Sequence, residues 1–374
     1  MSTATRFPEI RDQLNINNGT FGTYLSLGAI GGVIAFILVG HLVHSIGVRP
    51  IIFISATGLF LSLGLVPHIQ NAIFWLFVNI LIAFFWVSFH IANNAQAIHR
   101  QEEVGELILP KLHGLWSLGA LMTSILAIVI TPYVTLAWHI DVVVTIMWAL
   151  TMYGVIKSTP YFIEKNEEAD AFPNLSPFKI AKTFKFQPVI VVAMVFAMQT
   201  EFSIQDWSAI YAKDTIKMSS SSSIYGYAVF ISAMIVLRFN AKWMAAKWSE
   251  RELITKLPIL GGVGFAVCIS LGTWISQSNR VLGFIVAMVG FALAGFGSSI
   301  LAPTLFAISF RKTSLPSSVV VAQIGLTQTI ATFIAKVIIA WVAQATSVTV
   351  ALMIPALMLL ATTKFAHLGK ETKD

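Results

Sequence analysis

Eleven apolar stretches, each long enough to cross a lipid bilayer, constrain this chain more than any other feature. A spanning helix needs about 20 mainly apolar residues, because each residue rises 1.5 Å through about 30 Å of hydrocarbon. The stretches are 20–43, 50–67, 72–97, 112–132, 138–156, 188–211, 224–246, 254–276, 280–310, 316–343 and 346–366. They are longer than the alternating segments of about ten residues that build membrane β-barrels. We therefore predict an all-α membrane protein.

The composition agrees with a protein whose surface mostly faces lipid. Of 374 residues, 56% are hydrophobic and only 11% are charged, where a soluble domain has about 25% charged residues. This excludes a cytosolic enzyme and a nucleic-acid-binding protein. One cysteine, Cys268, leaves no intrachain disulfide and no paired-cysteine metal site. No phosphate-binding or metalloprotease motif occurs, so we expect no enzyme, no cofactor and no metal.

The lysines and arginines predict the orientation in the membrane. Seventeen of the 24 fall in one set of alternate loops, five fall in the opposite set, and Arg238 and Lys336 lie within apolar stretches. Basic loops face the cytoplasm, so the first set, with the C-terminus, is expected inside and residue 1 outside. The net charge of +7 then reflects cytoplasmic loops and not a nucleic-acid partner.

A long polar break divides the chain into two sets of spans. Residues 158–187 contain three prolines and mixed charges, which is typical of a linker. We predict an N-terminal helical bundle at 1–157, a cytoplasmic linker at 158–187 and a C-terminal bundle at 188–374. A basic turn ends one helix of each bundle, at 40–49 and again at 238–251, and parallel halves of this kind are typical of one transporter architecture. Residues 1–14 are expected to form the outer end of a first helix that is largely missing at the N-terminus.

The first of these basic turns resembles the loop motif of the major facilitator superfamily, Gly-x-x-x-Asp-Arg-x-Gly-x-Arg. Gly40, Gly47 and Arg49 match it, whereas His44 and Ser45 stand where the family has Asp and Arg. In the family, those two charges help to close the cytoplasmic side. The resemblance therefore implies a conformational role for the matching residues but not that latch.

Four further segments resemble the bacterial inner-membrane branch of this superfamily that is related to the fucose permeases. They are Arg-Phe-Pro-Glu-Ile-Arg at 6–11, Asn-Ala-Gln-Ala at 94–97, the segment 113–119 and the segment 206–211. The resemblance implies two pseudo-symmetric six-helix bundles, alternating access and a multi-pass protein of the bacterial inner membrane. We expect it to act as a monomer.

Polar residues within the apolar stretches are the candidate solute contacts, because polar groups in a bilayer are costly. The stretch 72–97 carries four of them within seven residues: His90, Asn93, Asn94 and Gln96. Their alternative role is hydrogen bonding between helices, worth about 0.6–2 kcal/mol each. Further candidates for solute binding, with gating, membrane anchoring or capping as alternatives, are His113, Trp116, Gln205, Trp207 and Gln328.

Glu201 is the candidate proton-coupling residue. It lies about 21 Å from the start of its helix at 1.5 Å per residue, where loss of solvent penalises a charged carboxylate. Lys336 lies at a similar depth on another helix and is a candidate partner, unless it extends to the outer interface. Asp206 lies nearer the outer surface, where helix capping is the alternative. Arg238 is expected to have a structural or conformational role.

Together these features predict a secondary transporter that moves a small polar solute, a sugar or a related metabolite, with a proton as the coupling ion. Amide side chains dominate the candidate solute wall, and amides suit hydroxyl groups. The alternatives are efflux of amphipathic compounds, and a membrane receptor or assembly protein that has kept the fold without transport.

Overall fold

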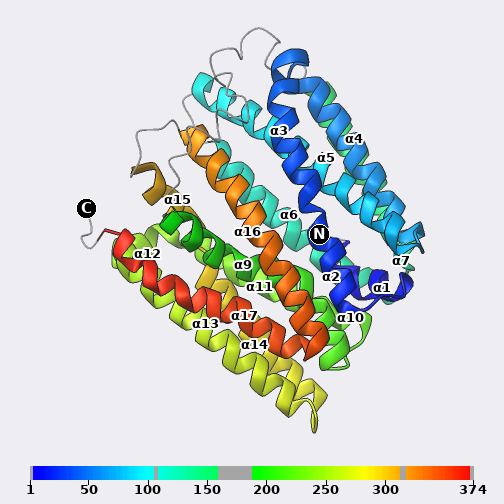
Figure 1. Cartoon of the computed structure of the whole chain (residues 1–374), viewed down its shortest axis with the longest axis vertical. Helices are drawn as coiled ribbons and strands as arrows, with labels where there is room; N and C mark the ends of the chain where they lie inside the picture. The colour runs from blue at the N-terminus through cyan, green and yellow to red at the C-terminus, as the bar shows by residue number, and fades with distance from the viewer. Residues whose placement is uncertain (1–2, 105–107, 159–187, 312–316, 371–374) are drawn as a thin grey trace.

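A computed structural model describes residues 3–104, 108–158, 188–311 and 317–370, and within these residues the chain is helical with no strand. The predicted linker at 158–187 lies outside the described residues except for Ser158. The described part before it is called the N-terminal half, and the part from residue 188 is called the C-terminal half; they form two neighbouring groups of helices (Figure 1).

The N-terminal half begins with two short helices and continues with long ones. Its elements are η1 (Ala4–Arg6), α1 (Phe7–Gln13), α2 (Asn18–Leu27), α3 (Ala29–Ile46), α4 (Val48–Leu65), η2 (Val66–His68), α5 (Ala72–Val104), α6 (Ile108–Ile130) and α7 (Leu136–Lys157). Residues 4–13, predicted as the outer end of a first helix, therefore form a 3-10 turn followed by a seven-residue helix.

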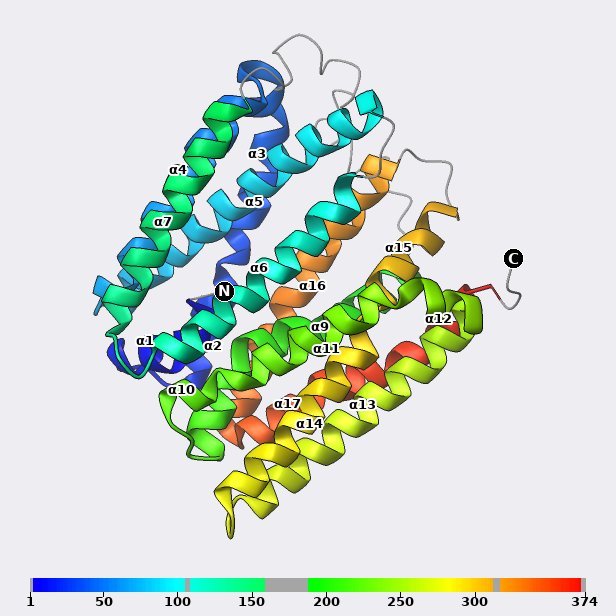
Figure 2. The same cartoon turned by 180° about the vertical axis from the view of Figure 1, so that it is seen from behind.

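The C-terminal half contains the remaining helices, several of them divided by a turn. Its elements are α9 (Pro188–Ile210), η5 (Tyr211–Thr215), α10 (Ser220–Ser223), α11 (Tyr225–Phe239), α12 (Ala241–Lys247), α13 (Glu250–Ile275), α14 (Arg280–Ser298), α15 (Leu301–Arg311), α16 (Ser317–Ala345), α17 (Val348–Ala361) and η6 (Thr362–Leu368). Seen from behind, α6 and α16 lie between the two groups (Figure 2).

The prediction of an all-helical membrane protein is confirmed. Ten described helices are long and apolar enough to cross a bilayer, and each covers one of the eleven predicted stretches. The eleventh stretch, 112–132, corresponds to α6, in which the apolar segment among the described side chains is Leu115–Ile130. Large apolar side chains cover the outside of these helices, for example Leu61 and Trp274, which are 66% and 69% exposed. Such a surface is stable in lipid and not in water.

Two glycines set the path of the first spans. Gly47 joins α3 to α4 with φ 85° and ψ 166°, a backbone conformation that side chains with a Cβ avoid. Gly31 lets α3 approach α5, because a Cβ there would overlap the carbonyl oxygen of Ile80. Gly47, which matches the loop motif, is therefore required by the backbone conformation at the turn between α3 and α4.

Helix starts in this chain carry the capping residues that free backbone N–H groups require. Asn17, Thr135, Asn279 and Ser347 each accept a hydrogen bond from an N–H of the following helix. Ser249 and Glu252 form a reciprocal capping box at the start of α13. Such residues fix where each span begins after a polar turn.

The halves meet mainly along α2 and α16. A Cβ at Gly22 would overlap the Cβ of Ala340, and one at Gly19 would lie 3.1 Å from the ring of Trp341. These contacts lie near the end of the molecule that holds α1, α10 and the start of α2 (Figure 1), here named the α1 end. The opposite end, where α7 stops at Lys157 and α9 starts at Pro188, is named the linker end.

Candidate functional site

α9 is the most buried of the spans, and the candidate site is built around it. Most of its residues are buried. Val189 and Val192, near its start, are exposed, and Phe196, Met198, Glu201, Phe202 and Gln205 are partly exposed. Positions separated by three, four and seven residues share one face of a helix. Because protein surrounds α9, a partly exposed face that carries a carboxyl and an amide is directed into the interior of the protein and not at lipid.

One buried ion pair connects α9 to α16. Lys336 Nζ lies 2.7 Å from Asp206 Oδ2, and the side chains are 20% and 4% exposed. The ammonium also lies 5.5 Å from the ring centre of Phe202, within the range of a cation–π contact. The predicted pairing of Lys336 with Glu201 is therefore wrong, as is its extension to the outer interface, because Asp206 holds the ammonium inside the protein.

The second charged pair connects α9 to α11. Arg238 Nη2 lies 3.8 Å from Glu201 Oε2, with side chains 32% and 13% exposed. The guanidinium also donates from Nε to the backbone carbonyl of Ser299 at 3.0 Å and from Nη1 to Ser117 Oγ at 3.2 Å. Ser117 belongs to α6 of the other half, a connection that the sequence did not indicate.

Several buried polar atoms close to these pairs have no hydrogen-bond partner among the described residues. They are Gln199 Oε1, Tyr227 OH and Thr332 Oγ1, from α9, α11 and α16. The hydroxyl of Tyr227 lies within electrostatic range of Glu201, Arg238 and Asp206. Unpaired buried polar atoms are costly, so this region has free hydrogen-bonding capacity.

The polar residues predicted on the fourth span lie on α5. His90 is exposed and Asn94 is half-buried, and they are joined within the helix by a 3.0 Å contact between Nδ1 and Nδ2. Asn93 and Gln96 are also half-buried, and Asn93 donates to the Phe89 carbonyl of its own helix. The two charged pairs, by contrast, join helices of the C-terminal half.

The other predicted solute contacts have different surroundings. Trp116 on α6 is 39% exposed, whereas Trp207 is only 3% exposed and belongs to the hydrophobic core, which corrects the prediction that it lines a solute wall. Gln328 on α16 donates from Nε2 to Met198 Sδ at 2.7 Å, and so serves the contact between α16 and α9. The side chain of His113 lies outside the described residues.

The loop-motif residues lie at the linker end. Arg49 is exposed at the start of α4, two residues after Gly47. The surroundings of Gly40 in α3 lie outside the described residues. Arg238, the counterpart in the other half, is instead drawn into the interior by its contacts with Glu201 and Ser299. The two basic turns, similar in sequence, therefore differ in their environment.

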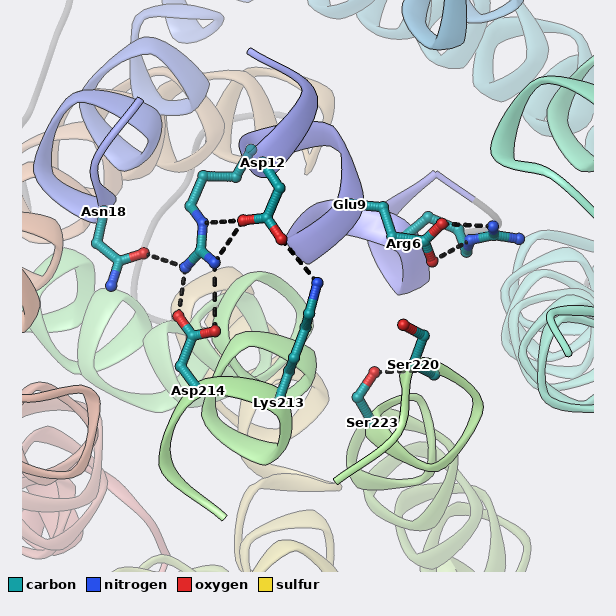
Figure 3. A network of polar contacts seen from close by, with 9 residues as sticks. Arg6, Glu9, Asp12, Asn18, Lys213, Asp214, Ser220 and Ser223 are labelled. Carbon is teal, nitrogen blue, oxygen red and sulfur yellow. Dashed lines mark hydrogen bonds and ion pairs between the residues drawn. The ribbon is translucent and has the colours of Figure 1, made fainter. Parts of the chain in front are cut away.

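A network of charges joins the halves at the α1 end (Figure 3). Arg11 of α1 forms an ion pair with Asp214 of η5 and also donates to Asp12 and Asn18 at 2.7 Å. Lys213 of η5 donates to Asp12 at 2.7 Å. The sequence indicated none of these pairs, because α1 and η5 lie about 200 positions apart and these residues fall outside the predicted spans.

A second polar cluster anchors the first residues of the chain within the N-terminal half. Arg6 is 2% exposed and forms an ion pair with Glu9 at 2.5 Å. Its Nη1 also contacts Thr131 Oγ1 at 3.3 Å and His139 Nδ1 at 3.2 Å. Arg6 therefore fixes η1 and α1 to the turn between α6 and α7, so α1 is held by one half and paired by charge with the other.

Comparison with known proteins places this geometry in a family context. A family model described as Major Facilitator Superfamily matches residues 2–340. A relative in Yersinia pestis, an uncharacterized MFS-type transporter, is 24% identical over 363 residues, which cover 94% of this chain and 87% of the relative. An uncharacterized transporter of Sinorhizobium fredii is 24% identical over 334 residues, covering 86% of this chain and 81% of the relative.

Solved transporter structures have the same fold over nearly the whole chain. A D-xylose–proton symporter superimposes with a TM-score of 0.69 at 14% identity and covers 98% of this chain and 93% of its own. The nucleoside transporter NupG superimposes with a TM-score of 0.70 at 12% identity, covering 97% of this chain and 93% of its own. At these identities the likeness concerns the fold alone. No group of metal-binding side chains occurs in the part of the chain that the structure describes.

Proposed function

Because the chain belongs to the Major Facilitator Superfamily, a family of membrane transporters and not of enzymes, we propose that it moves a small polar solute by alternating access. The observation that carries this proposal is the site on α9, where two charged pairs from three helices border a partly exposed polar face. Charged residues placed inside a membrane protein mark transport pathways more often than they stabilise the fold.

The solute class follows from the groups available to it. Gln205 on α9 and His90, Asn93 and Asn94 on α5 offer amide and imidazole groups, and Phe202 offers an apolar ring. Such a set suits a solute with several hydroxyl groups, since amides both donate and accept. The superimposed structures are named for xylose and nucleosides, which are also hydroxyl-rich, and this supports a sugar or a related metabolite as the solute.

A proton is the coupling ion in this proposal. Glu201 and Asp206 are the interior carboxyls of α9, and among the described residues each pairs with one basic side chain on a different helix. A proton taken up by either carboxyl removes its attraction for that partner, which changes how α9 is held against α11 or α16. Charge pairs that join separate helices therefore provide a route from proton binding to helix movement.

We further propose that the protein lies in the bacterial inner membrane with the α1 end outside and the linker end in the cytoplasm. The excess of lysine and arginine in the loops of the linker end supports this orientation. The charge network between Arg11, Asp12, Lys213 and Asp214 then closes the external side, so the structure corresponds to a state that exchanges solute with the cytoplasm.

Uptake into proteoliposomes with an imposed pH gradient, measured across a panel of sugars, nucleosides and amphipathic drugs, tests the proposal. We expect accumulation of a hydroxylated solute that stops when the gradient is collapsed. Glu201→Gln should abolish gradient-driven accumulation and keep solute exchange without a gradient. Glu103→Gln is the matched control, because Glu103 pairs with Arg100 on an exposed helix end.

The other outcomes contradict specific parts of the proposal. Transport restricted to amphipathic drugs would favour efflux and refute the solute class. Gradient-driven accumulation that survives Glu201→Gln and Asp206→Asn would refute the coupling sites. Specific binding of a ligand without any transport would favour a receptor with this fold.

A further inference from the structure

Arg238 has a set of contacts that the proposed transport site does not require. Away from the α1 end, Arg238 Nη1 donates a hydrogen bond of 3.2 Å to Ser117 Oγ of the other half. The same guanidinium faces Glu201 Oε2 at 3.8 Å. One planar group therefore touches both a candidate proton acceptor and the opposite half.

The position of this guanidinium is fixed by a break in a neighbouring span. α14 ends at Ser298 and α15 begins at Leu301, and Pro303 follows in the first turn of α15. Proline has no N–H, so the carbonyl of Ser299, four residues earlier, lacks its helical donor. Arg238 Nε supplies that donor at 3.0 Å and is thereby anchored at the break.

We propose that Arg238 is a positioning residue that converts the charge of Glu201 into contact between the two halves, an inference that rests on the proposed transport function. With Nε anchored at Ser299, the rigid guanidinium fork keeps its two Nη groups in one plane. A charged Glu201 attracts Nη2 and so holds Nη1 against Ser117. A proton that binds the Glu201 carboxylate removes this attraction and weakens the contact with α6.

The surroundings of Glu201 leave Arg238 as its direct charged partner among the described residues. From α11, Tyr227 and Arg238 face it, and on its own helix Asp206 is already paired with Lys336 of α16. α17 contains no ionisable residue. The remaining ionisable residues on elements packed against α9 lie at the ends of the bundle: Arg6, Glu9, Arg11, Asp12, Tyr211, Lys213, Asp214, Tyr225, Arg280, Arg311, Lys364 and His367.

Distances between spin labels, measured on the full chain in lipid nanodiscs, test this proposal without any solute. Replacement of Cys268, the single cysteine, gives a background for labels at Val104→Cys in α5 and Ala246→Cys in α12. Both positions are exposed, near the linker end of their halves. We expect the distance distribution to shift between pH 8 and pH 5, and Glu201→Gln to show the pH 5 distribution at both pH values.

Two further variants distinguish the proposed positioning role of Arg238 from a merely structural role. Ser117→Ala removes the acceptor on α6, and Arg238→Lys keeps the charge beside Glu201 but lacks the planar fork; each should lose the pH-dependent shift. Ser124→Ala is the matched control, because Ser124 is a buried serine of α6 whose hydroxyl donates only to Ala120 of its own helix. That variant should shift as the wild type does.

The proposal is overturned if the wild type shows no shift, or if Ser117→Ala and Arg238→Lys shift as the wild type does. It is also overturned if the shift persists in Glu201→Gln. If Arg238→Lys does not fold, Ser117→Ala alone decides, since it removes one hydroxyl and no charge. A solute panel that finds no transport would refute the proposed function and leave this distance measurement intact, so the two failures are distinguishable.

Discussion

The Asp206–Lys336 pair gives the sharpest quantitative prediction from this structure. Its two charged atoms are 2.7 Å apart, and the side chains are 4% and 20% exposed. At an effective dielectric constant of about 20, Coulomb's law gives an attraction of about 6 kcal/mol at this distance. Desolvation of both groups offsets much of it. The pair therefore matters most when one member is removed and the other is left buried without a partner.

We expect Lys336→Met and Asp206→Asn each to lower the free energy of unfolding by about 3–5 kcal/mol, the usual loss for one partner of a buried ion pair. Lys336→Met should cost more, because it leaves the less exposed of the two groups, Asp206, unpaired. The double variant removes both charges, and we expect it to be clearly more stable than the sum of the two single losses predicts.

Unfolding by SDS in mixed micelles, followed through the fluorescence of the ten tryptophans, measures these free energies. The Glu252–Lys256 pair provides a matched control, because its charged atoms are also 2.7 Å apart but the side chains are 42% and 51% exposed. There the coupling energy should be about 0.3–0.5 kcal/mol. A coupling energy for Asp206 and Lys336 no larger than that of the control would refute the reasoning.

Three further predictions concern the α1 end and the loop motif. Partial burial disfavours a charged Asp12, but hydrogen bonds and charge from Lys213 and Arg11 outweigh it and hold the pKa of Asp12 below its usual range. The charged Asp12 therefore stabilises the fold fully above about pH 4, and this stabilisation is lost at lower pH. Asp12→Asn should reduce the fall in melting temperature below pH 4, and an unchanged fall would contradict this. Gly22→Val should overlap Ala340 and cost the closed α1 end about 1–3 kcal/mol. The loss would be measured as faster thiol labelling of Ala343→Cys, a buried position of α16. Gly154→Val, where a Cβ meets open space, is the control that should leave the labelling rate unchanged. Gly47→Ala should lower the free energy of unfolding by about 1–3 kcal/mol, because the φ of 85° with ψ of 166° at Gly47 suits only glycine. The same change at Gly64, where a Cβ makes only ordinary contact, should be nearly neutral.

The spans were predictable from the sequence because the thickness of the bilayer sets a length that apolar runs must meet. Ten of eleven stretches became helices of sufficient length and hydropathy. The eleventh stretch became α6 (Ile108–Ile130), of whose apolar run the described part is Leu115–Ile130. Helix starts were less exactly predictable, since capping residues such as Ser249 extend a helix beyond its apolar run.

The partners of the buried charges were not predictable from depth alone. Lys336 lies 130 positions after Asp206, and Gln328 lies 130 positions after Met198, so two contacts fix one register between the parallel helices α9 and α16. Glu201 lies five residues before Asp206, which is about 7.5 Å along the axis and about 140° around it. An error of one or two turns in the assumed helix ends was enough to select the wrong carboxyl.

The connections between halves were invisible in the sequence for a different reason. Arg11 lies in a seven-residue helix and Asp214 in a five-residue π-helical segment, and segments this short show too little periodicity for a neighbour to be inferred. Pro303 is a signal in the sequence that a carbonyl of its helix lacks a donor, although our predictions from the sequence did not use it. The sequence could not indicate that the donor comes from Arg238, because that depends on how α11 packs against α14.

The strength of the contacts at the α1 end bears on how a protein of this fold can alternate its access between the two sides of the membrane. Four pairs join the halves there among the described residues: Arg11 with Asp214, Asp12 with Lys213, Asn18 with Gln344, and Thr23 with Trp341. Pairs at a partly exposed surface contribute about 0–1 kcal/mol each, so together they bias the closed form by only a few kcal/mol. One proton bound across a difference of one pH unit supplies about 1.4 kcal/mol. These polar pairs therefore add only a small bias to the apolar packing between the halves at this end, such as that of Gly22 on Ala340, and proton and solute binding can offset that bias.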